Sequence, residues 1–308
     1  MISDDVILRH ILQARITEPS LAEQILAHRR RRPRWQEQPL VLVAADHPAR
    51  RTVAAGNDPW AMARRVDLIR RIARLMLQPF VDGVLVTPDI MDELAILNHW
   101  VVHHGGPDFL DNKVLIGSMN RAGLADTVFD LDDFVSAYDV LSLKKARLDA
   151  GKLLLRVDPA VDASSRTIRY VASALAELAR ADIPVFLEPI AVPLSTDDLV
   201  RLMGVASALG PTSRGRWLKV PMVEDFERVA QATTCPIVLL GGANVGDPKT
   251  LVAAVQRCRQ AGPQVRGVLI GRGLLFPQDG ADARMVVREI ASLMHGGAVA
   301  EVMQWPDL

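Results

Sequence analysis

One lysine of this sequence lies where a lysine is costly to keep. Lys219 is enclosed in the apolar run Trp217-Leu218-Lys219-Val220-Pro221, and an ammonium group is expensive to bury unless it is paired or neutralised. One interpretation is a nucleophile: burial, together with cations such as Lys152 or Arg156, would lower the pKa of the amine and let it attack a carbonyl. The other interpretation is a structural ion pair with Glu188.

Two carboxylates and a second lysine occupy comparable positions in other apolar runs. Glu188 ends one run, and a carboxylate beside an imine can move protons while a carbinolamine forms and loses water. Asp46 follows the first run, where it can bind a substrate hydroxyl, share in proton transfer or merely cap a turn. Lys152 lies at a similar depth in the fourth run and competes for the role of nucleophile. We expect these three residues to form the catalytic group together with Lys219.

Glycines and arginines after the last apolar runs are typical of a phosphate site. Gly241 and Gly242 follow the seventh run, and Gly271 and Arg272 follow the eighth. Glycine lets backbone N–H groups approach a phosphate closely, and arginine adds charge-assisted hydrogen bonds. Arg156, at the end of the fourth run, is the further candidate for binding a carboxylate or a phosphate. These five residues are the predicted substrate-binding group.

The elements that must position these residues alternate regularly along the chain. Short, continuously apolar runs are typical of parallel strands buried on both faces, and the helical patterns at 60–78, 165–181, 195–209 and 247–260 supply crossovers between them. Eight such units predict a single (β/α)₈ TIM barrel, in which chemistry occurs at the C-terminal ends of the strands. The predicted strands are 40–43, 83–86, 114–116, 153–155, 185–187, 217–220, 237–240 and 268–270.

The chain divides into a barrel and two flanking segments. We expect an N-terminal helical extension over 1–38, with Ser3 as a helix cap, the barrel over 39–295 and a C-terminal tail over 296–308. The basic segment 28–34 ends the extension. Positive charge at a helix C-terminus is favourable, so we interpret it as a solvated helix end or a subunit contact rather than a nucleic-acid patch.

Composition restricts the class of partner. The 36 basic and 36 acidic side chains cancel, so the whole chain lacks the attraction that general nucleic-acid or anionic-membrane binding requires. Two cysteines, Cys235 and Cys258, form neither a disulfide framework nor a zinc site. The sequence predicts a cytoplasmic protein that acts on a small molecule, without a cofactor, and the N-terminal helices leave room for a homo-oligomer.

These residues together resemble the class I, Schiff-base aldolases that include archaeal-type fructose-bisphosphate, tagatose-bisphosphate and deoxyribose-phosphate aldolases. The resemblance covers most of residues 39–278. It implies that Lys219 forms the imine, that Glu188 and Asp46 assist, and that the glycine loops with Arg272 bind phosphate. The segments that carry it are Ala45-Asp46-His47, Gly151-Lys152-Leu153-Leu154-Leu155, Phe186-Leu187-Glu188-Pro189, Leu218-Lys219-Val220-Pro221, Leu240-Gly241-Gly242 and Ile270-Gly271-Arg272.

Two positions depart from members of that group. Arg156-Val157-Asp158 stands where tagatose-type enzymes tend to have a tyrosine, and the seventh run, Pro236-Ile237-Val238-Leu239-Leu240, lacks the second lysine of deoxyribose-phosphate aldolases. The expected activity is therefore cleavage or formation of a C–C bond in a phosphorylated ketose or keto sugar acid. The precise substrate stays open.

Two other functions compete with this one. His99, His103 and His104 with Glu93 could bind a metal for a metal-dependent barrel lyase, but in a barrel the C-terminal end of their helix lies at the rim opposite the active site. The second is a sensor that binds a phosphorylated sugar without turnover. A binding pocket has no need of a buried amine, so the pair of Lys219 and Glu188 favours an enzyme.

Overall fold

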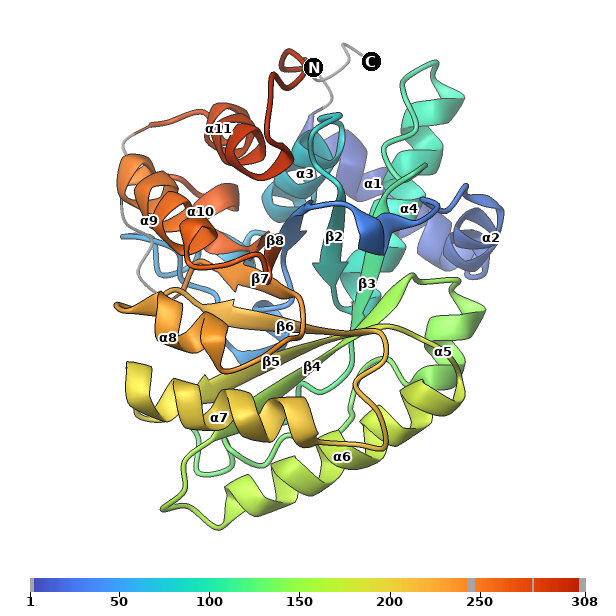
Figure 1. Cartoon of the computed structure of the whole chain (residues 1–308). Coiled ribbons are helices and arrows are strands. Elements are labelled where there is room, and N and C mark those ends of the chain that lie inside the picture. Colours follow the sequence, from blue (N-terminus) through green and yellow to red (C-terminus); the bar gives the residue numbers. More distant parts are fainter. Residues whose placement is uncertain (1–2, 243–246, 279, 305–308) are drawn as a thin grey trace.

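Within the described residues, eight parallel strands pair in sequence order, and β1 also pairs with β8, which closes the barrel. This computed structural model describes residues 3–242, 247–278 and 280–304. The predicted TIM barrel is confirmed, and all eight apolar runs form strands (Figure 1). The strands are β1 (Leu40–Ala44), β2 (Gly83–Val86), β3 (Val114–Ser118), β4 (Ala150–Val157), β5 (Val185–Ala191), β6 (Arg216–Pro221), β7 (Ile237–Leu240) and β8 (Val265–Ile270).

Helices surround the strands, as the predicted crossovers require (Figure 1). Each of the four predicted helical stretches contains or overlaps a long helix, which begins within five residues of the expected position. The helices are α1 (Asp4–Thr17), α2 (Leu21–His28), α3 (Arg65–Met76), α4 (Pro88–His103), α5 (Val140–Lys145), α6 (Ala163–Arg180), α7 (Thr196–Ala208), α8 (Phe226–Gln231), α9 (Pro248–Gln260), α10 (Arg272–Leu275) and α11 (Ala283–His295). In the described part of the chain, no helix is long and apolar enough to cross a membrane.

The N-terminal segment packs against the barrel as helices. Ser3 caps α1, because its hydroxyl accepts a hydrogen bond from the backbone N–H of Val6 at 3.3 Å. Trp35, just before β1, is buried at the start of the strands, with its ring centroid 5.9 Å from Phe186 and 5.8 Å from Trp217. The predicted division at 38/39 and 295/296 stays a prediction, and residues 1–2 and 305–308 of the two flanking segments lie outside the described residues.

The basic segment after α2 is tied to the barrel by ion pairs, which the sequence analysis did not predict, while the Arg30 side chain stays 75% exposed. The subunit contact stays a prediction. Four consecutive arginines form ion pairs with aspartates that precede β2, β3 and β4 at the N-terminal ends of the strands. Because each pair joins residues 50 to 120 positions apart, the pattern was invisible in the local sequence. Arg29 and Arg31 pair with Asp149, Arg30 with Asp111, and Arg32 with Asp82.

Candidate active site

Three predicted catalytic side chains come from adjacent strands and meet inside the barrel. Alternate residues of a strand face the same side, so Lys152 on β4, Glu188 on β5 and Lys219 on β6 all point inward. The Nζ of Lys219 lies 2.9 Å from Oε1 of Glu188. The Nζ of Lys152 pairs with the other oxygen, Oε2. One carboxylate thus bridges two buried lysines.

The fourth predicted catalytic residue, Asp46, joins this group from the end of β1. Its Oδ2 lies 3.4 Å from the Nζ of Lys152 and accepts a hydrogen bond from the hydroxyl of Ser118 at 3.1 Å. Arg121 also pairs with Oδ2, and its Nε donates to the Ser118 hydroxyl at 2.7 Å. The structure therefore brings all four predicted residues together and adds a fifth, Arg121, that the sequence analysis missed.

Burial and mutual charge set the ionisation of this cluster. Burial lowers the pKa of both lysines. Burial alone would raise the pKa of Glu188, but the two lysines and Arg121 outweigh it and hold the pKa well below its ordinary value. For Lys219, the positive charges of Arg121 and Arg272 add to the effect of burial.

The cations that the sequence analysis named are placed differently from these two arginines. Lys152 shares Glu188 with Lys219, and the charge of Lys219 adds to burial in lowering the pKa of Lys152. Arg156 forms an ion pair with Asp130. The lowered pKa of Lys219 agrees with the prediction, and Arg121 and Arg272 contribute to it.

A cavity of about 470 Å³ separates the roles of the two lysines. Lys219 lines it together with Asp46 and Glu188, whereas Lys152 has a fully buried side chain and is not among the lining residues. A substrate carbonyl in the cavity can therefore reach the amine of Lys219 but meets Lys152 only behind Glu188. Depth therefore distinguishes the two lysines, because only Lys219 is at the cavity wall.

The predicted substrate-binding residues also line this cavity. Gly241, Gly242, Gly271, Arg272 and Arg156 are all at its wall. A terminal N–H of Arg272 donates to the carbonyl of Gly242 at 3.3 Å. Among the described residues, the Nε of Arg272 is buried without a hydrogen-bond partner. A polar group of this kind is available to an anionic ligand.

Gly271 has a structural reason to be glycine besides any contact with phosphate. A Cβ at this position would lie 2.4 Å from Cε1 of His47 and 2.6 Å from the carbonyl oxygen of Ala44. His47 thus occupies the space that a side chain would need. Burial lowers the pKa of His47 well below its ordinary value, and the charges of Lys219 and Arg272 lower it further, so the ring is neutral.

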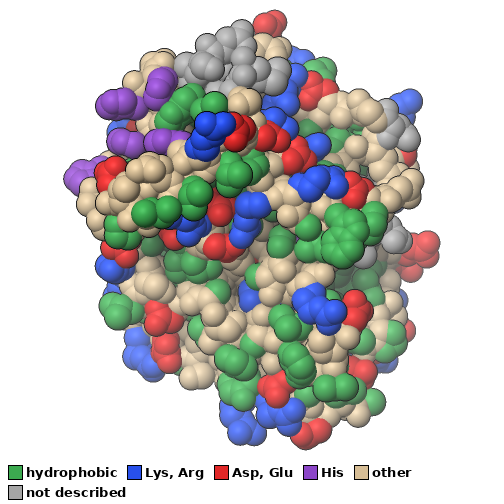
Figure 2. Space-filling model, turned by 180° about the vertical axis from the view of Figure 1, so that it is seen from behind, with side chains coloured by type: hydrophobic (Ala, Val, Ile, Leu, Met, Phe, Trp, Pro, Cys, Tyr) green, Lys and Arg blue, Asp and Glu red, His purple; other side chains and the backbone are tan. Residues whose placement is uncertain are grey.

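The histidines near the end of α4 do not form the metal site of the rival interpretation. His99, His103 and His104 are exposed, and Figure 2 shows histidines gathered at one side of the surface. Glu93 is instead buried and paired with Arg15 and Arg65. Within the residues that the structure describes, no group of three or more His, Cys, Asp or Glu side chains could hold a metal ion.

The comparisons with known proteins identify a family. The profile of the Cgl0159-like family matches residues 38–291. The chain belongs to the Cgl0159-like family. It is 37% identical to Cgl0159 from Corynebacterium glutamicum, whose crystal structure superposes on this chain with a TM-score of 0.87. The alignment covers 96% of this chain and 99% of Cgl0159. No curated protein sequence matches.

More distant solved structures share the fold of this Cgl0159-like chain. A Schiff-base-forming fructose-1,6-bisphosphate aldolase is 16% identical with a TM-score of 0.59, covering 89% of this chain and 99% of its own. An archaeal fructose-1,6-bisphosphate aldolase, solved with the carbinolamine intermediate on its catalytic lysine, is 16% identical with a TM-score of 0.60, covering 90% and 100%. At this identity the likeness shows a class I aldolase-type fold.

Residues of the Cgl0159-like site that sequence reasoning missed come from loops. Arg121 follows β3 by three positions, so attention to every charged residue after a strand would have found it. Arg50 lines the cavity from the loop after β1, and one of its terminal nitrogens lies 2.6 Å from Oδ1 of Asp130. Asp130 lies twelve positions beyond the end of β3 in an irregular segment, where the sequence carries no periodic signal.

Proposed function

We propose that this Cgl0159-like protein is a class I aldolase that cleaves or forms a C–C bond in a phosphorylated ketose or keto sugar acid. The observation that carries the proposal is the placement of Lys219: it is a buried lysine at the wall of the cavity, 2.9 Å from a carboxylate oxygen of Glu188. An amine in this setting is a nucleophile toward a carbonyl.

The charges around Lys219 support a neutral amine. Glu188 and Asp46 supply two negative charges, and Arg121 with one protonated lysine balances them. Lys152 touches both carboxylates, whereas Lys219 contacts only Glu188 among the described ion pairs. Burial and the charges of Arg121 and Arg272 lower the pKa of Lys219, which favours the free electron pair on the amine that lines the cavity.

The reaction uses these groups in sequence. The amine of Lys219 adds to the substrate carbonyl, and Glu188 relays the protons that let the carbinolamine lose water. The resulting iminium ion accepts the electron pair of the C–C bond that breaks, and the carboxylate at 2.9 Å stabilises its charge. Asp46 is the candidate to take the proton of the substrate hydroxyl. Its Oδ2 already contacts Lys152, Ser118 and Arg121, whereas its Oδ1 has only the Nδ1 of His47 nearby, at 3.9 Å. Asp46 and His47 both line the cavity.

Other features support the substrate class. Gly241, Gly242 and Arg272 line the same cavity as Lys219, and the buried Nε of Arg272 has no partner among the described residues. A phosphate there would leave the carbonyl free to approach Lys219. Among solved neighbours, a fructose-bisphosphate aldolase is described as Schiff-base forming, which agrees with this chemistry.

Borohydride trapping tests the proposal. The protein is incubated with phosphorylated ketoses and keto sugar acids, each with sodium borohydride, and the adduct is mapped by peptide mass. Lys219→Met should abolish both adduct and cleavage, while Lys152→Met, the matched control, should still form the adduct. Excess EDTA should leave cleavage intact. An adduct on Lys152, or cleavage by Lys219→Met, would overturn the assignment, and binding without any adduct or cleavage would favour the sensor.

A further inference from the structure

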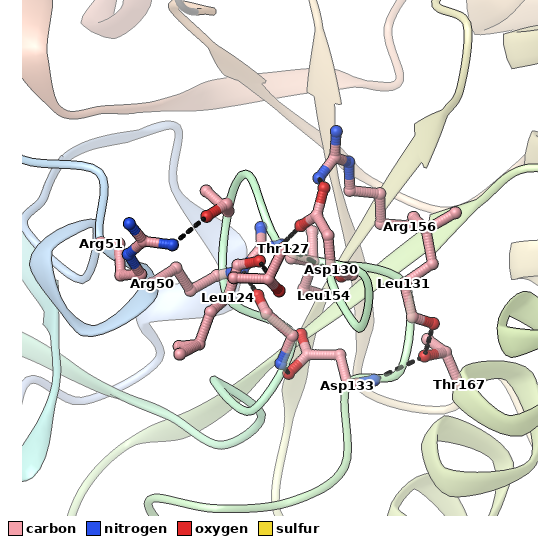
Figure 3. A network of polar contacts seen from close by, with 12 residues as sticks. Arg50, Arg51, Leu124, Thr127, Asp130, Leu131, Asp133, Leu154, Arg156 and Thr167 are labelled. Atoms are coloured by element: carbon pink, nitrogen blue, oxygen red, sulfur yellow. Dashed lines mark hydrogen bonds and ion pairs between the residues drawn. The ribbon is translucent and has the colours of Figure 1, made fainter.

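A single carboxylate lies between two arginines that line the cavity. Asp130 pairs through Oδ1 with the terminal nitrogen of Arg50 at 2.6 Å and through Oδ2 with Arg156. Figure 3 shows the Asp130 side chain between the two guanidinium groups, one from the loop after β1 and one from the end of β4. Two arginines that converge on one carboxylate form the geometry that proteins use to bind a carboxylate or phosphate group.

Both arginines are placed to meet a ligand. Arg50 and Arg156 line the same cavity as Lys219, and their side chains are 12% and 28% exposed. Arg50 is additionally held by the carbonyl of Gly123, to which its Nε donates at 2.6 Å. Among the described residues, Asp130 is the one side chain that forms a hydrogen bond or an ion pair with Arg156. Without this carboxylate, two positive groups would face the cavity.

The loop that carries Asp130 is anchored on either side of it. The backbone N–H of Gly123 donates to Asp133 at 2.9 Å, and the hydroxyl of Thr167 on α6 donates to the carbonyl of Leu131 at 2.6 Å. Between the anchors, Val128 is fully exposed. Rotation of the Asp130 side chain can therefore move its carboxylate away from Arg50 and Arg156 without breaking either anchor.

We propose that Arg50 and Arg156 form an anion subsite, separate from the corner at Arg272, and that Asp130 occupies it while the cavity is empty. An oxyanion of the ligand, phosphate or carboxylate, displaces Asp130 and takes over both arginines. Asp130 thereby weakens binding of any anion at this subsite, because the anion must compete with an internal carboxylate. The inference rests on the proposed function only in placing an anionic substrate in this cavity.

Titration calorimetry with simple anions tests the subsite without any turnover. In an Arg272→Ala background, which weakens the other predicted corner, Asp130→Asn should bind inorganic phosphate about tenfold or more tightly than the background protein, since two charged donors are released. Adding Arg156→Gln should remove the gain. The matched control is Asp132→Asn, which neutralises a carboxylate of the same loop that pairs with Arg166 outside the cavity. It should leave phosphate binding unchanged.

Parallel titration with acetate separates the two kinds of ligand group, because tighter binding of acetate than of phosphate would identify a carboxylate subsite. Unchanged or weaker binding of both anions to Asp130→Asn would overturn the proposal.

The carboxyl carbon resonance of Asp130 in the unsubstituted protein, observed by NMR, gives a second test that does not depend on a folded variant. Phosphate should shift this resonance, because the carboxylate leaves both guanidinium groups. An unchanged resonance at saturating phosphate would contradict displacement. Because neither test uses the imine, failure here leaves the aldolase proposal standing, and absence of a borohydride adduct leaves the anion subsite standing.

Discussion

Asp149→Asn should destabilise the fold from the rim opposite the active site. Asp149 precedes β4 and receives two arginines of the basic segment: its Oδ2 lies 2.7 Å from a terminal nitrogen of Arg29, and its Oδ1 lies 2.7 Å from the Nε of Arg31. The side chains of Asp149 and Arg29 are each 1% exposed. The substitution keeps the shape and removes the counter-charge.

The magnitude follows from what remains around Arg29. Removing one partner of a buried ion pair typically costs about 3–5 kcal/mol, because the other charge is left uncompensated. Arg29 also donates to the backbone carbonyls of Lys113 and Arg147, at 3.2 and 2.8 Å, which partly solvate it. We therefore expect the lower end, about 3 kcal/mol. This is a large share of the roughly 5–15 kcal/mol that stabilises a typical protein.

Urea unfolding followed by circular dichroism measures the effect as a change in the free energy of unfolding. The control is Asp111→Asn, which weakens the pair with the neighbouring Arg30, whose side chain is 75% exposed. Exposed ion pairs contribute little, so this variant should unfold close to the unsubstituted protein. Equal destabilisation by both substitutions, or a change below about 1 kcal/mol for Asp149→Asn, would refute the argument from burial.

Two further outcomes follow from the packing of single residues. Gly271→Ala would place a Cβ 2.4 Å from His47 and should lower the free energy of unfolding in urea by about 1–3 kcal/mol. The control is Gly273→Ala, whose Cβ would have its nearest neighbour at 3.1 Å and should destabilise the protein less. The reverse order would contradict the steric account. Burial lowers the pKa of Lys113 from 10.5 to about 8, so between these values the unfolded state binds more protons and the free energy of unfolding should gain from rising pH. Urea unfolding of Lys113→Met and of the unsubstituted protein between pH 8 and 10.5 tests this. The variant should lose the rise in the free energy of unfolding, and an identical pH dependence of the two proteins would contradict the prediction.

The barrel could be predicted because its strands are buried on both faces. A strand such as β7, Ile237-Val238-Leu239-Leu240, must be apolar throughout, and helices of regular period separate it from its neighbours. A lysine in such a run is conspicuous, which is why Lys219 was identified. Glu188 and Lys152 follow from the same rule. Alternation by two residues along each strand then turns these side chains toward a common interior.

The other site residues lie in a segment where no period places them. Arg121 could have been found only from its position just after β3, and Asp130 could not be predicted, because it belongs to the irregular segment between β3 and α5, whose path is set by bonds such as that between Asp133 and Gly123. The sequence analysis interpreted Gly271 as a phosphate contact and missed a second reason for the glycine, because the space beside it is filled by His47 from a distant part of the chain. Such contacts arise only when the barrel closes.

The sequence by itself determined which segments are strands, which helices connect them and which buried ionisable groups they carry. The tertiary structure alone decided the partners: Lys152 lies behind Glu188 and Lys219 lies before it, and four arginines pair with aspartates at the opposite rim, with Arg29 buried. Local patterns record whether a residue is buried, because burial repeats with the period of its element. They do not record which opposite charge, 50 to 120 residues away, compensates the cost of burying a charged side chain.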